Sequence, residues 1–556
     1  MVVVGIIFIG IIVAGAWIAA APADKSLLDR YFREHSGRKV ATVVAAGVLG
    51  LLALLSVFNS FLGPMTPDES IYLLHARTYL ETFNRFTLSW ENKGIVLTWL
   101  LAPGVALLGP TVAAAALIQL CAYVVAFISL YGVLRFTMSR TRAGLLVLMA
   151  VCLVYSPLLW GAGGQPENFG VACLLVALYA AWRAEGRWWF VGGAMVACTL
   201  FLKLTLALAP AAVMATAVFA QGAQSSRVGK KAGSLARRFA VGLAGPGVRV
   251  AAGFLLVAAL VIGWIALFDN LAQCYRQTVE WPIQYRSDLG LQRWAVREAG
   301  QLLHTCGLDY LLAGAILGLV YGWAVGLRRE TLIIGAAIAA EALRLLGERR
   351  PYPYLTLMFV APMLVAVSFF GARRRAEGGS SVSWLLPLYL SLVLLLATAA
   401  VQAKSFIRGG LRHLPSPNEY MAQAMRTHYR PGESMFILDI DGYQEILLRL
   451  KAPAPPPFLY SHFTHLSPDE QRQALQRRAE RPPDWIIVKN PPDTKVRFTL
   501  LGDTYYIPDP YPAALVLERR SGAALSPQVP TPRMYRLEVD TGYLQAWHVE
   551  QVNSGT

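Results

Sequence analysis

The sequence predicts an α-helical polytopic membrane protein that carries a small C-terminal α/β domain outside the membrane. The 556 residues are 55% hydrophobic and only 15% charged, and the mean hydropathy is +0.46. This composition is too apolar for a soluble enzyme of that length. Apolar runs long enough to span a bilayer recur over residues 1–403, and they predict about twelve transmembrane helices in addition to juxtamembrane helices. Residues 404–556 are Pro-rich and charged, which marks the second domain.

The charge distribution favours membrane lipids over nucleic acid as a partner. The formal net charge is +16 and the pI is about 9.6. Most Lys and Arg residues nevertheless fall in short clusters between apolar runs, which is the positive-inside pattern of cytoplasmic loops. No basic recognition module for nucleic acid is apparent.

The N-terminal region sets the expected orientation. Residues 1–20 form an apolar run with no preceding Lys or Arg, so we expect a retained span and not a cleaved signal peptide. The basic stretch 25–39 is then cytoplasmic, and a second span at about 40–62 leads to an outer loop at 64–93.

The short run 94–109 is interpreted as a juxtamembrane or re-entrant helix. It has about 16 residues including Pro103, whereas a span needs about 20. If it crossed the membrane, the basic linker 135–142 and most later basic linkers would face outward, against the charge rule. The remaining spans are therefore expected at about 111–134, 143–162, 167–182, 188–202, 204–220, 250–268, 308–327, 331–346, 354–371 and 383–403.

The C-terminal domain is predicted from short β-like runs and one polar helix. Residues 435–440 and 485–488 are typical of strands, and 468–479 of a helix. Four of the six cysteines lie in apolar runs as small hydrophobic residues. The other two, Cys274 and Cys306, flank a polar loop and could pair as a disulfide if that loop is outside.

Adjacent carboxylates, Asp68 and Glu69, follow the span at 40–62. Pro67 suits the first turn of a helix, so we expect a short helix over about 68–84 with both acids at its N-terminus, where the helix dipole favours negative charge. His75 would share a face of this helix with two tyrosines. A solvated helix cap is the alternative interpretation of the acidic pair.

Further charged residues are expected at the same outer face, and together they suit transfer of a sugar from a lipid phosphate to a hydroxyl. Lys203 interrupts an apolar stretch, where a cation at a helix centre costs roughly 2.5–3.5 kcal/mol. Its alternative explanation is snorkelling from a helix end. A carboxylate can take the proton of the attacking hydroxyl, and Lys or Arg can stabilise the departing phosphate. The other outer-face charged residues are Glu91, Lys93, Glu167, Arg344, Glu348, Arg349 and Arg350.

In their order along residues 40–400, these features resemble the GT-C glycosyltransferases, and within them the protein mannosyltransferase and aminoarabinose transferase group. The resemblance is carried by the Asp-Glu pair, by Glu91-Asn92-Lys93 leading into Gly94-Ile-Val-Leu-Thr-Trp99-Leu-Leu-Ala-Pro103, and by Leu108-Gly109. The stretches 192–203 and 350–362 are also similar to later segments of that group. The sequence departs from the family pattern where Asn92 separates the acid from Lys93 and where Gly94-Ile95 replaces two prolines.

The resemblance implies an inverting hexosyl- or pentosyltransferase that uses a polyprenyl-phosphate sugar and acts on a glycan, lipid or protein acceptor. It makes Asp68 the base or an acceptor-binding carboxylate, and Glu69 a helper in positioning or metal binding. The residues expected to contact the donor phosphate are Lys93, Lys203, Arg349 and Arg350. The residues expected to line the substrate cavity are Glu91, Glu167, Tyr352, Tyr354 and His75.

Several alternatives stay open at this point. Tyr352 and Tyr354 also fit an interfacial aromatic belt, and His75 fits a structural role better than a catalytic one. A divalent cation, Mg or Mn, is conceivable, but an adjacent Asp-Glu pair supplies too few of the roughly six oxygens that such ions need. An O-antigen ligase or polymerase moving whole lipid-linked glycans, or a lipid-linked glycan transporter, are the rival functions. Compact loops suit a bacterial inner membrane, with the loop 64–93 and the C-terminal domain extracytoplasmic.

Overall fold

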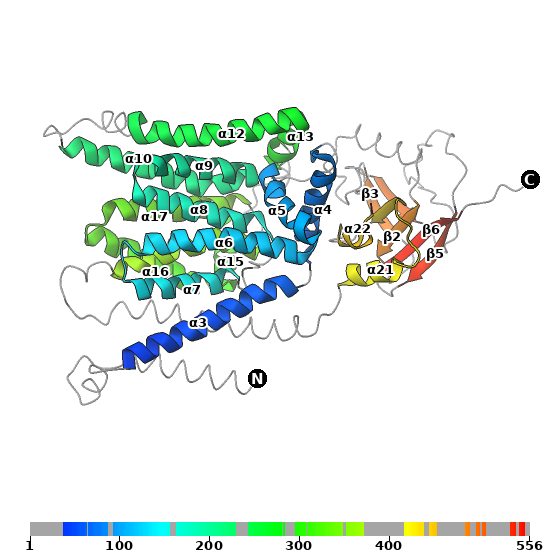
Figure 1. The fold of residues 1–556 in the computed structure, drawn as a ribbon, viewed down its shortest axis with the longest axis horizontal. Helices are drawn as coiled ribbons and strands as arrows, with labels where there is room; N and C mark the ends of the chain where they lie inside the picture. Colours follow the sequence, from blue (N-terminus) through cyan, green and yellow to red (C-terminus); the bar gives the residue numbers. More distant parts are fainter. Residues whose placement is uncertain are drawn as a thin grey trace, which may run out of the picture.

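The fold is known from a computed structural model of the chain. It describes residues 37–63, 65–86, 93–155, 159, 163–228, 243–280, 282–283, 295–306, 308–348, 352–371, 416–438, 444–452, 484–489, 496–500, 503–507, 534–540 and 544–550. Most of these residues are helical (Figure 1). The predicted spans at 1–20 and 383–403 and the predicted helix at 468–479 lie outside the described residues.

The helices of the first two thirds of the chain form one bundle. The long helices run roughly alongside one another, while α4 and α5 lie at one end of the bundle (Figure 1). In chain order they are α3 (Gly37–Leu62), α4 (Pro67–Thr82), α5 (Ile95–Leu108), α6 (Val112–Leu134), α7 (Arg140–Val154), α8 (Pro166–Arg183), α9 (Gly186–Leu202), η2 (Leu204–Ala207), α10 (Leu208–Val228), η3 (Leu243–Gly247), α12 (Val248–Phe268), α13 (Leu271–Tyr275), η4 (Arg276–Glu280), α15 (Ala295–Thr305), α16 (Asp309–Ala324), α17 (Arg328–Glu348), η5 (Pro353–Thr356), α18 (Leu357–Ser368) and η6 (Phe369–Gly371).

Helices occur at each expected span that the structure describes, and the expected helix at 68–84 is confirmed as α4. Within the described residues, three helices are long and apolar enough to cross a membrane, namely Val112–Leu134, Leu204–Ala223 and Ala244–Phe268. A fourth candidate is Ala46–Leu62 taken together with α4, but the two helices are bent by 64°. This bend directs α4 across the end of the bundle. The helix α5 has only 14 residues, which agrees with its interpretation as too short for a span.

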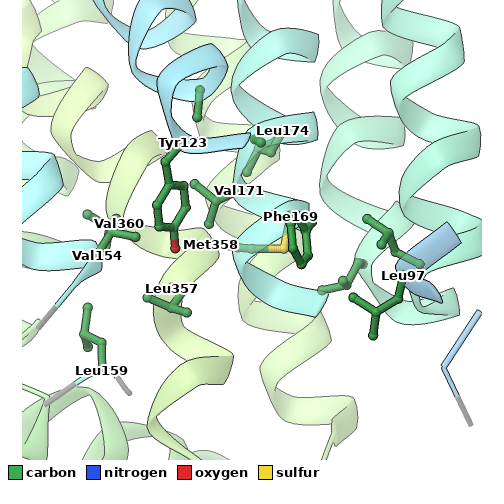
Figure 2. Close-up of a cluster of buried hydrophobic side chains, with 14 of the residues drawn as sticks. Leu97, Tyr123, Val154, Leu159, Phe169, Val171, Leu174, Leu357, Met358 and Val360 are labelled. Atoms are coloured by element: carbon green, nitrogen blue, oxygen red, sulfur yellow. The ribbon is translucent and has the colours of Figure 1, made fainter. Parts of the chain in front are cut away.

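The interior of the bundle is built around α8, whose side chains are almost all buried. The residues Phe169, Val171 and Leu174 pack among side chains of α5, α6, α7 and α18 (Figure 2). Gly170 faces Met358 of α18, where an added Cβ would lie 3.1 Å from the sulfur. Apolar contact of this kind fixes α8 in the centre, so polar residues at its N-terminus are held in place by the core.

The helices α9 and α12 pack backbone against backbone through two glycines. A Cβ built on Gly193 would lie 1.9 Å from the carbonyl oxygen of Val250, and a Cβ on Gly253 would lie 2.0 Å from that of Phe190. Small residues that let backbones approach closely are typical of helix contacts in membranes. This contact holds α12 against α9, the helix that precedes Lys203.

The described residues of the C-terminal segment combine two helices with two sheets. The helices are α21 (Pro417–Met425) and α22 (Gln444–Leu450), and the strands are β1 (Met435–Leu438), β2 (Trp485–Lys489), β3 (Val496–Leu500), β4 (Asp503–Ile507), β5 (Met534–Asp540) and β6 (Leu544–Glu550). One sheet has the order β1-β2-β6-β5, with β1 and β2 parallel and the other pairs antiparallel. The hairpin β3-β4 forms the second sheet. The expected strands at 435–440 and 485–488 correspond to β1 and β2.

All six cysteines are free thiols in the structure, including Cys274 and Cys306. The conditional pairing of these two as a disulfide is therefore not found.

We predict that Gly253→Ala lowers the stability of the purified protein by about 1–3 kcal/mol, because the added methyl group would meet the backbone of α9. The control is Gly263→Ala on the same helix, where nothing lies within 4 Å of the added Cβ. There we expect no loss, since alanine is the better helix former by about 0.5–1 kcal/mol. Thermal unfolding of both variants in detergent measures the difference. Equal stability of the two variants would contradict this packing.

Candidate functional site

The N-terminus of α4 is fixed by a capping box. The Thr66 hydroxyl oxygen accepts a hydrogen bond from the Glu69 amide at 3.2 Å, and the Thr66 amide donates to Glu69 Oε2 at 3.2 Å. Pro67 occupies the first helical position, where its missing N–H costs nothing. The Thr-x-x-Glu spacing is a local sequence signal for this arrangement.

Glu69 is buried, which excludes the solvated helix cap for this member of the acidic pair. Its side chain is 2% exposed, and burial raises its pKa to about 8. The nearby carboxylate of Glu445 acts in the same direction, while the hydrogen bond from the Thr66 amide lowers the pKa. A carboxyl group with this pKa is mostly protonated at neutral pH.

Asp68, in contrast, is half-buried and linked to the loop before α8. Gln165 Nε2 donates a hydrogen bond to Asp68 Oδ2 at 3.3 Å. The Tyr72 hydroxyl donates to Gln165 Oε1 at 3.4 Å, so one amide joins two residues of α4. Asp68 therefore faces the N-terminus of α8, where Glu167 begins the buried polar part of the bundle.

Lys93 is brought to the same place by an unusually close backbone contact. The Gly94 amide donates to the carbonyl oxygen of Leu202 at 2.8 Å, and a Cβ on Gly94 would lie 1.7 Å from the Phe201 oxygen. Only glycine fits there. The contact holds Lys93 next to the end of α9, and its ammonium nitrogen lies 5.8 Å from the centroid of the Tyr72 ring.

Lys203 lies at the break between α9 and η2, as the sequence led us to expect. Its backbone is extended, with φ −163° and ψ 125°. Its Nζ lies 2.8 Å from Glu167 Oε1 and 3.0 Å from Glu348 Oε1, and the Thr205 hydroxyl also donates to Glu348. Glu167 is fully buried and Glu348 is 9% exposed. Lys203 is thus an ion-paired cation shared between α8 and α17, and snorkelling into solvent does not describe it.

Arg344 forms a second buried ion pair close by. Its Nε lies 2.8 Å from Glu341 Oε2, and its Nη2 donates to the carbonyl oxygen of Leu355. This bond fixes η5, where the rings of Tyr352 and Tyr354 stack at 5.4 Å with an angle of 8° between their planes.

The stacked tyrosines lie within electrostatic reach of the acidic residues. The phenol group of Tyr354 interacts electrostatically with Glu167, Asp68 and Glu348. Asp68 and Glu167 therefore both lie near one ring, although they come from different helices.

The C-terminal segment contacts α4 on another side. The Ser70 hydroxyl lies 3.5 Å from Gln444 Oε1 in hydrogen-bond geometry, and Arg77 Nη2 donates to the carbonyl oxygen of Ala452 at 2.6 Å. Glu445, which raises the pKa of Glu69, is itself held by Arg449 at 2.8 Å. Figure 1 shows α22 beside α4 at the end of the bundle. These contacts were not foreseen, because no local sequence pattern connects residues so far apart.

The remaining predicted residues are distributed as follows. His75 is buried within α4 at 2% exposure, which agrees with a structural role. Glu91, Arg349 and Arg350 lie outside the described residues. Within the described residues, no group of three or more His, Cys, Asp or Glu side chains could hold a metal ion.

The segment after α4 is anchored by Asp269, a residue that no local sequence pattern singles out. Its carboxylate accepts hydrogen bonds from the amides of Arg85 at 2.7 Å and Phe86 at 2.9 Å. Gln277 Nε2 donates to the carbonyl oxygen of Phe86 at 2.8 Å. The segment after α4 is therefore tied to the end of α12 and to η4.

The structure thus defines a class of protein, a helical transmembrane bundle with a partly buried site of carboxylates, cations and tyrosines at one end. Residues 92–248 match the sequence model of the family described as dolichyl-phosphate-mannose-protein mannosyltransferase. The resemblance to the protein mannosyltransferase group is confirmed over this segment, which is less than a third of the chain and includes Lys93, Glu167 and Lys203.

Comparison with solved structures gives matches of low sequence identity. The crystal structure of ArnT from Cupriavidus metallidurans in the apo state has 12% identity and a TM-score of 0.49, covering 83% of this chain and 97% of that one. The same protein bound to undecaprenyl phosphate has 11% identity and a TM-score of 0.47, covering 82% and 96%. The archaeal oligosaccharyltransferase AglB from Archaeoglobus fulgidus, in complex with an inhibitory peptide and a dolichol-phosphate, has 13% identity and a TM-score of 0.41, covering 84% and 70%. A search of curated protein sequences gave no match.

We predict that the contribution of Glu69 to the free energy of unfolding falls as the pH rises from about 4.5 to about 8. In this window the folded state binds a proton on Glu69 that the unfolded state has released, so raising the pH favours unfolding. The size of this contribution is on the order of a few kcal/mol.

In Glu69→Gln this part of the pH dependence should disappear, and the melting temperature should fall less between pH 5 and pH 8 than in the wild type. Glu81→Gln, which changes an exposed acid of the same helix, is the control and should keep the wild-type slope. Identical slopes in the wild type and Glu69→Gln would contradict the burial of Glu69.

Proposed function

We propose that the chain is a GT-C-type inverting glycosyltransferase, a hexosyl- or pentosyltransferase that takes a monosaccharide from a polyprenyl-phosphate donor. The acceptor is a hydroxyl group of an envelope glycan, lipid or protein at the outer face of the membrane. The observation that carries the proposal is the meeting of Asp68, Lys93 and the buried Glu167–Lys203–Glu348 group at one end of the bundle. The family match over residues 92–248 supports the same class of reaction.

Asp68 is assigned the role of general base. It is the less buried of the two adjacent acids, and its partner Gln165 donates to it, which favours an ionised carboxylate. Asp68 takes the proton of the acceptor hydroxyl while that oxygen forms a bond to the anomeric carbon. The bond from the anomeric carbon to the phosphate oxygen breaks on the opposite face, and its electron pair leaves with the phosphate. A single displacement of this kind inverts the configuration of the sugar.

Lys93 is assigned to the departing phosphate, together with Arg349 and Arg350. Its ammonium group lies over the Tyr72 ring, on the helix that carries Asp68, so base and cation are held at a short separation. Lys203 is assigned a mainly structural role, because its ammonium group neutralises Glu167 and Glu348. A donor phosphate would have to compete with these two carboxylates to bind the Lys203 ammonium group.

The substrate cavity is assigned to the surface between α4, the N-terminus of α8 and η5. Tyr352 and Tyr354 present a stacked pair of rings there, which suits contact with a sugar ring or with the start of the lipid. Glu69 keeps α4 in place through the capping box. Glu91 is assigned to the lining of the cavity. We place the site and the C-terminal segment 404–556 on the extracytoplasmic side of a bacterial inner membrane, because the basic linkers then lie inside.

We predict that Asp68→Asn lowers the rate of sugar transfer by about 10²–10⁴-fold, because the amide cannot accept the proton of the attacking hydroxyl. The assay offers the purified protein in liposomes a panel of labelled polyprenyl-phosphate monosaccharides with extracted envelope lipids. Glu81→Gln is the control, since Glu81 is exposed at 60% on the same helix, and its transfer rate should equal that of the wild type.

Transfer by Asp68→Asn at the wild-type rate would contradict the assignment of the base. A wild-type protein that is silent with every monosaccharide donor but uses longer lipid-linked glycans would identify a ligase or polymerase instead.

A further inference from the structure

The loop before α8 contains a glutamine whose side chain has no role in capping its own helix. Gln165 occupies the N-cap position of α8, with φ −62° and ψ 146°, yet its side chain makes no cap hydrogen bond. It is only 5% exposed. A buried primary amide needs partners for its polar atoms, and those of Gln165 lie on α4, with Tyr72 and Asp68.

The backbone around Gln165 is held rigidly enough to direct this amide. Gly163 and Gly164 have φ values of +111° and +63°, a region that favours glycine. A Cβ on Gly163 would lie 3.3 Å from the Thr66 hydroxyl, and the Gly164 amide donates to Gln119 Oε1 at 3.1 Å. Pro166 fixes the first turn of α8. The loop therefore packs directly on the N-cap of α4 and cannot shift independently of Asp68.

The two hydrogen bonds of Gln165 give its amide one orientation. An ionised carboxylate only accepts hydrogen bonds, so Asp68 Oδ2 requires the NH₂ group, and the distance to Nε2 is 3.3 Å. The amide oxygen then faces Tyr72, whose hydroxyl donates to it at 3.4 Å. The ring of Tyr72 in turn lies 5.8 Å from the ammonium nitrogen of Lys93.

We propose that Gln165 is a positioning residue that fixes the rotamer of the Asp68 carboxylate and, through Tyr72, its separation from Lys93. This inference rests on the function proposed above, in which Asp68 is the base and Lys93 meets the donor phosphate. The amide does not touch the reacting atoms. It keeps the Asp68 carboxylate in one orientation toward the acceptor hydroxyl. It also favours the ionised carboxylate, because a hydrogen bond donated to a carboxylate stabilises its charged form.

The test compares Gln165→Leu, Tyr72→Phe and the wild type in the liposome transfer assay over a range of pH. Gln165→Leu should lower kcat by roughly 10–100-fold with little change in KM for the donor, since a displaced base slows the reaction without removing a phosphate contact. The acid limb of the pH–rate profile should move to higher pH. Tyr72→Phe should shift the profile in the same direction by a smaller amount, because the amide keeps Asp68 but loses its second anchor.

Gln119→Leu is the control for a purely structural effect. It removes the acceptor of the Gly164 amide in the same loop but changes neither the Gln165 nor the Asp68 side chain. We expect Gln119→Leu to lower the melting temperature and to lower the transfer rate by the same factor at every pH. The acid limb of its pH–rate profile should coincide with that of the wild type. A Gln165→Leu profile that keeps the wild-type shape would overturn the proposal.

A measurement that needs no activity separates this inference from the function on which it rests. Thermal unfolding of Gln165→Leu, Asp68→Ala and the double variant forms a double-mutant cycle. If the two side chains interact, the melting temperature of the double variant falls by less than the sum of the two single changes. Additive changes would overturn the positioning role whatever the protein transfers. If the wild type shows no transferase activity but the cycle shows coupling between Gln165 and Asp68, the proposed reaction is wrong and the contact between the two side chains stands.

Discussion

Lys203 lies between the carboxylates of Glu167 and Glu348, and the arrangement of the site depends on this shared ion pair. A buried charge is tolerated only where opposite charges and hydrogen bonds surround it. Here the two acids come from α8 and α17, while the cation comes from the break after α9. The pairing therefore joins three helices at one point. The helix α5 is then held against that break, because Gly94 bonds to the carbonyl oxygen of Leu202.

The ion pairs also determine how positive charge is distributed in the site. Lys203 pairs with Glu167 and Glu348, and Arg344 pairs with Glu341, so both cations already have carboxylate partners. Lys93 belongs to another part of the site, where its ammonium nitrogen lies 5.8 Å from the centroid of the Tyr72 ring. In the proposed function, the acidic cluster is a scaffold that positions Asp68 and the tyrosines.

The general architecture was predictable from the sequence because it depends on local patterns. Apolar runs and Pro67 located α4 and α5 within two or three residues, and the isolated cation at Lys203 correctly marked a break between helices. The partners of these residues were not predictable. Nothing in the chain order indicates that Gln165 bonds to Asp68, that Glu348 shares Lys203, or that Gln444 reaches Ser70, since each pair joins distant segments. The hydrogen bond between Glu69 and the Thr66 amide follows from the capping box, a local signal in the sequence, whereas the burial of Glu69 depends on tertiary packing.

The sidedness of α4 is the central claim, because a base that uses an extracytoplasmic acceptor has to face that side. An alkaline phosphatase fusion made after about residue 85, at the end of this helix, tests it most directly. The account predicts that the enzyme is active, as it is only outside the cytoplasm, whereas a fusion within the basic linker 135–142 is inactive. An inactive fusion after residue 85, with the full-length fusion present in the membrane, would contradict the account.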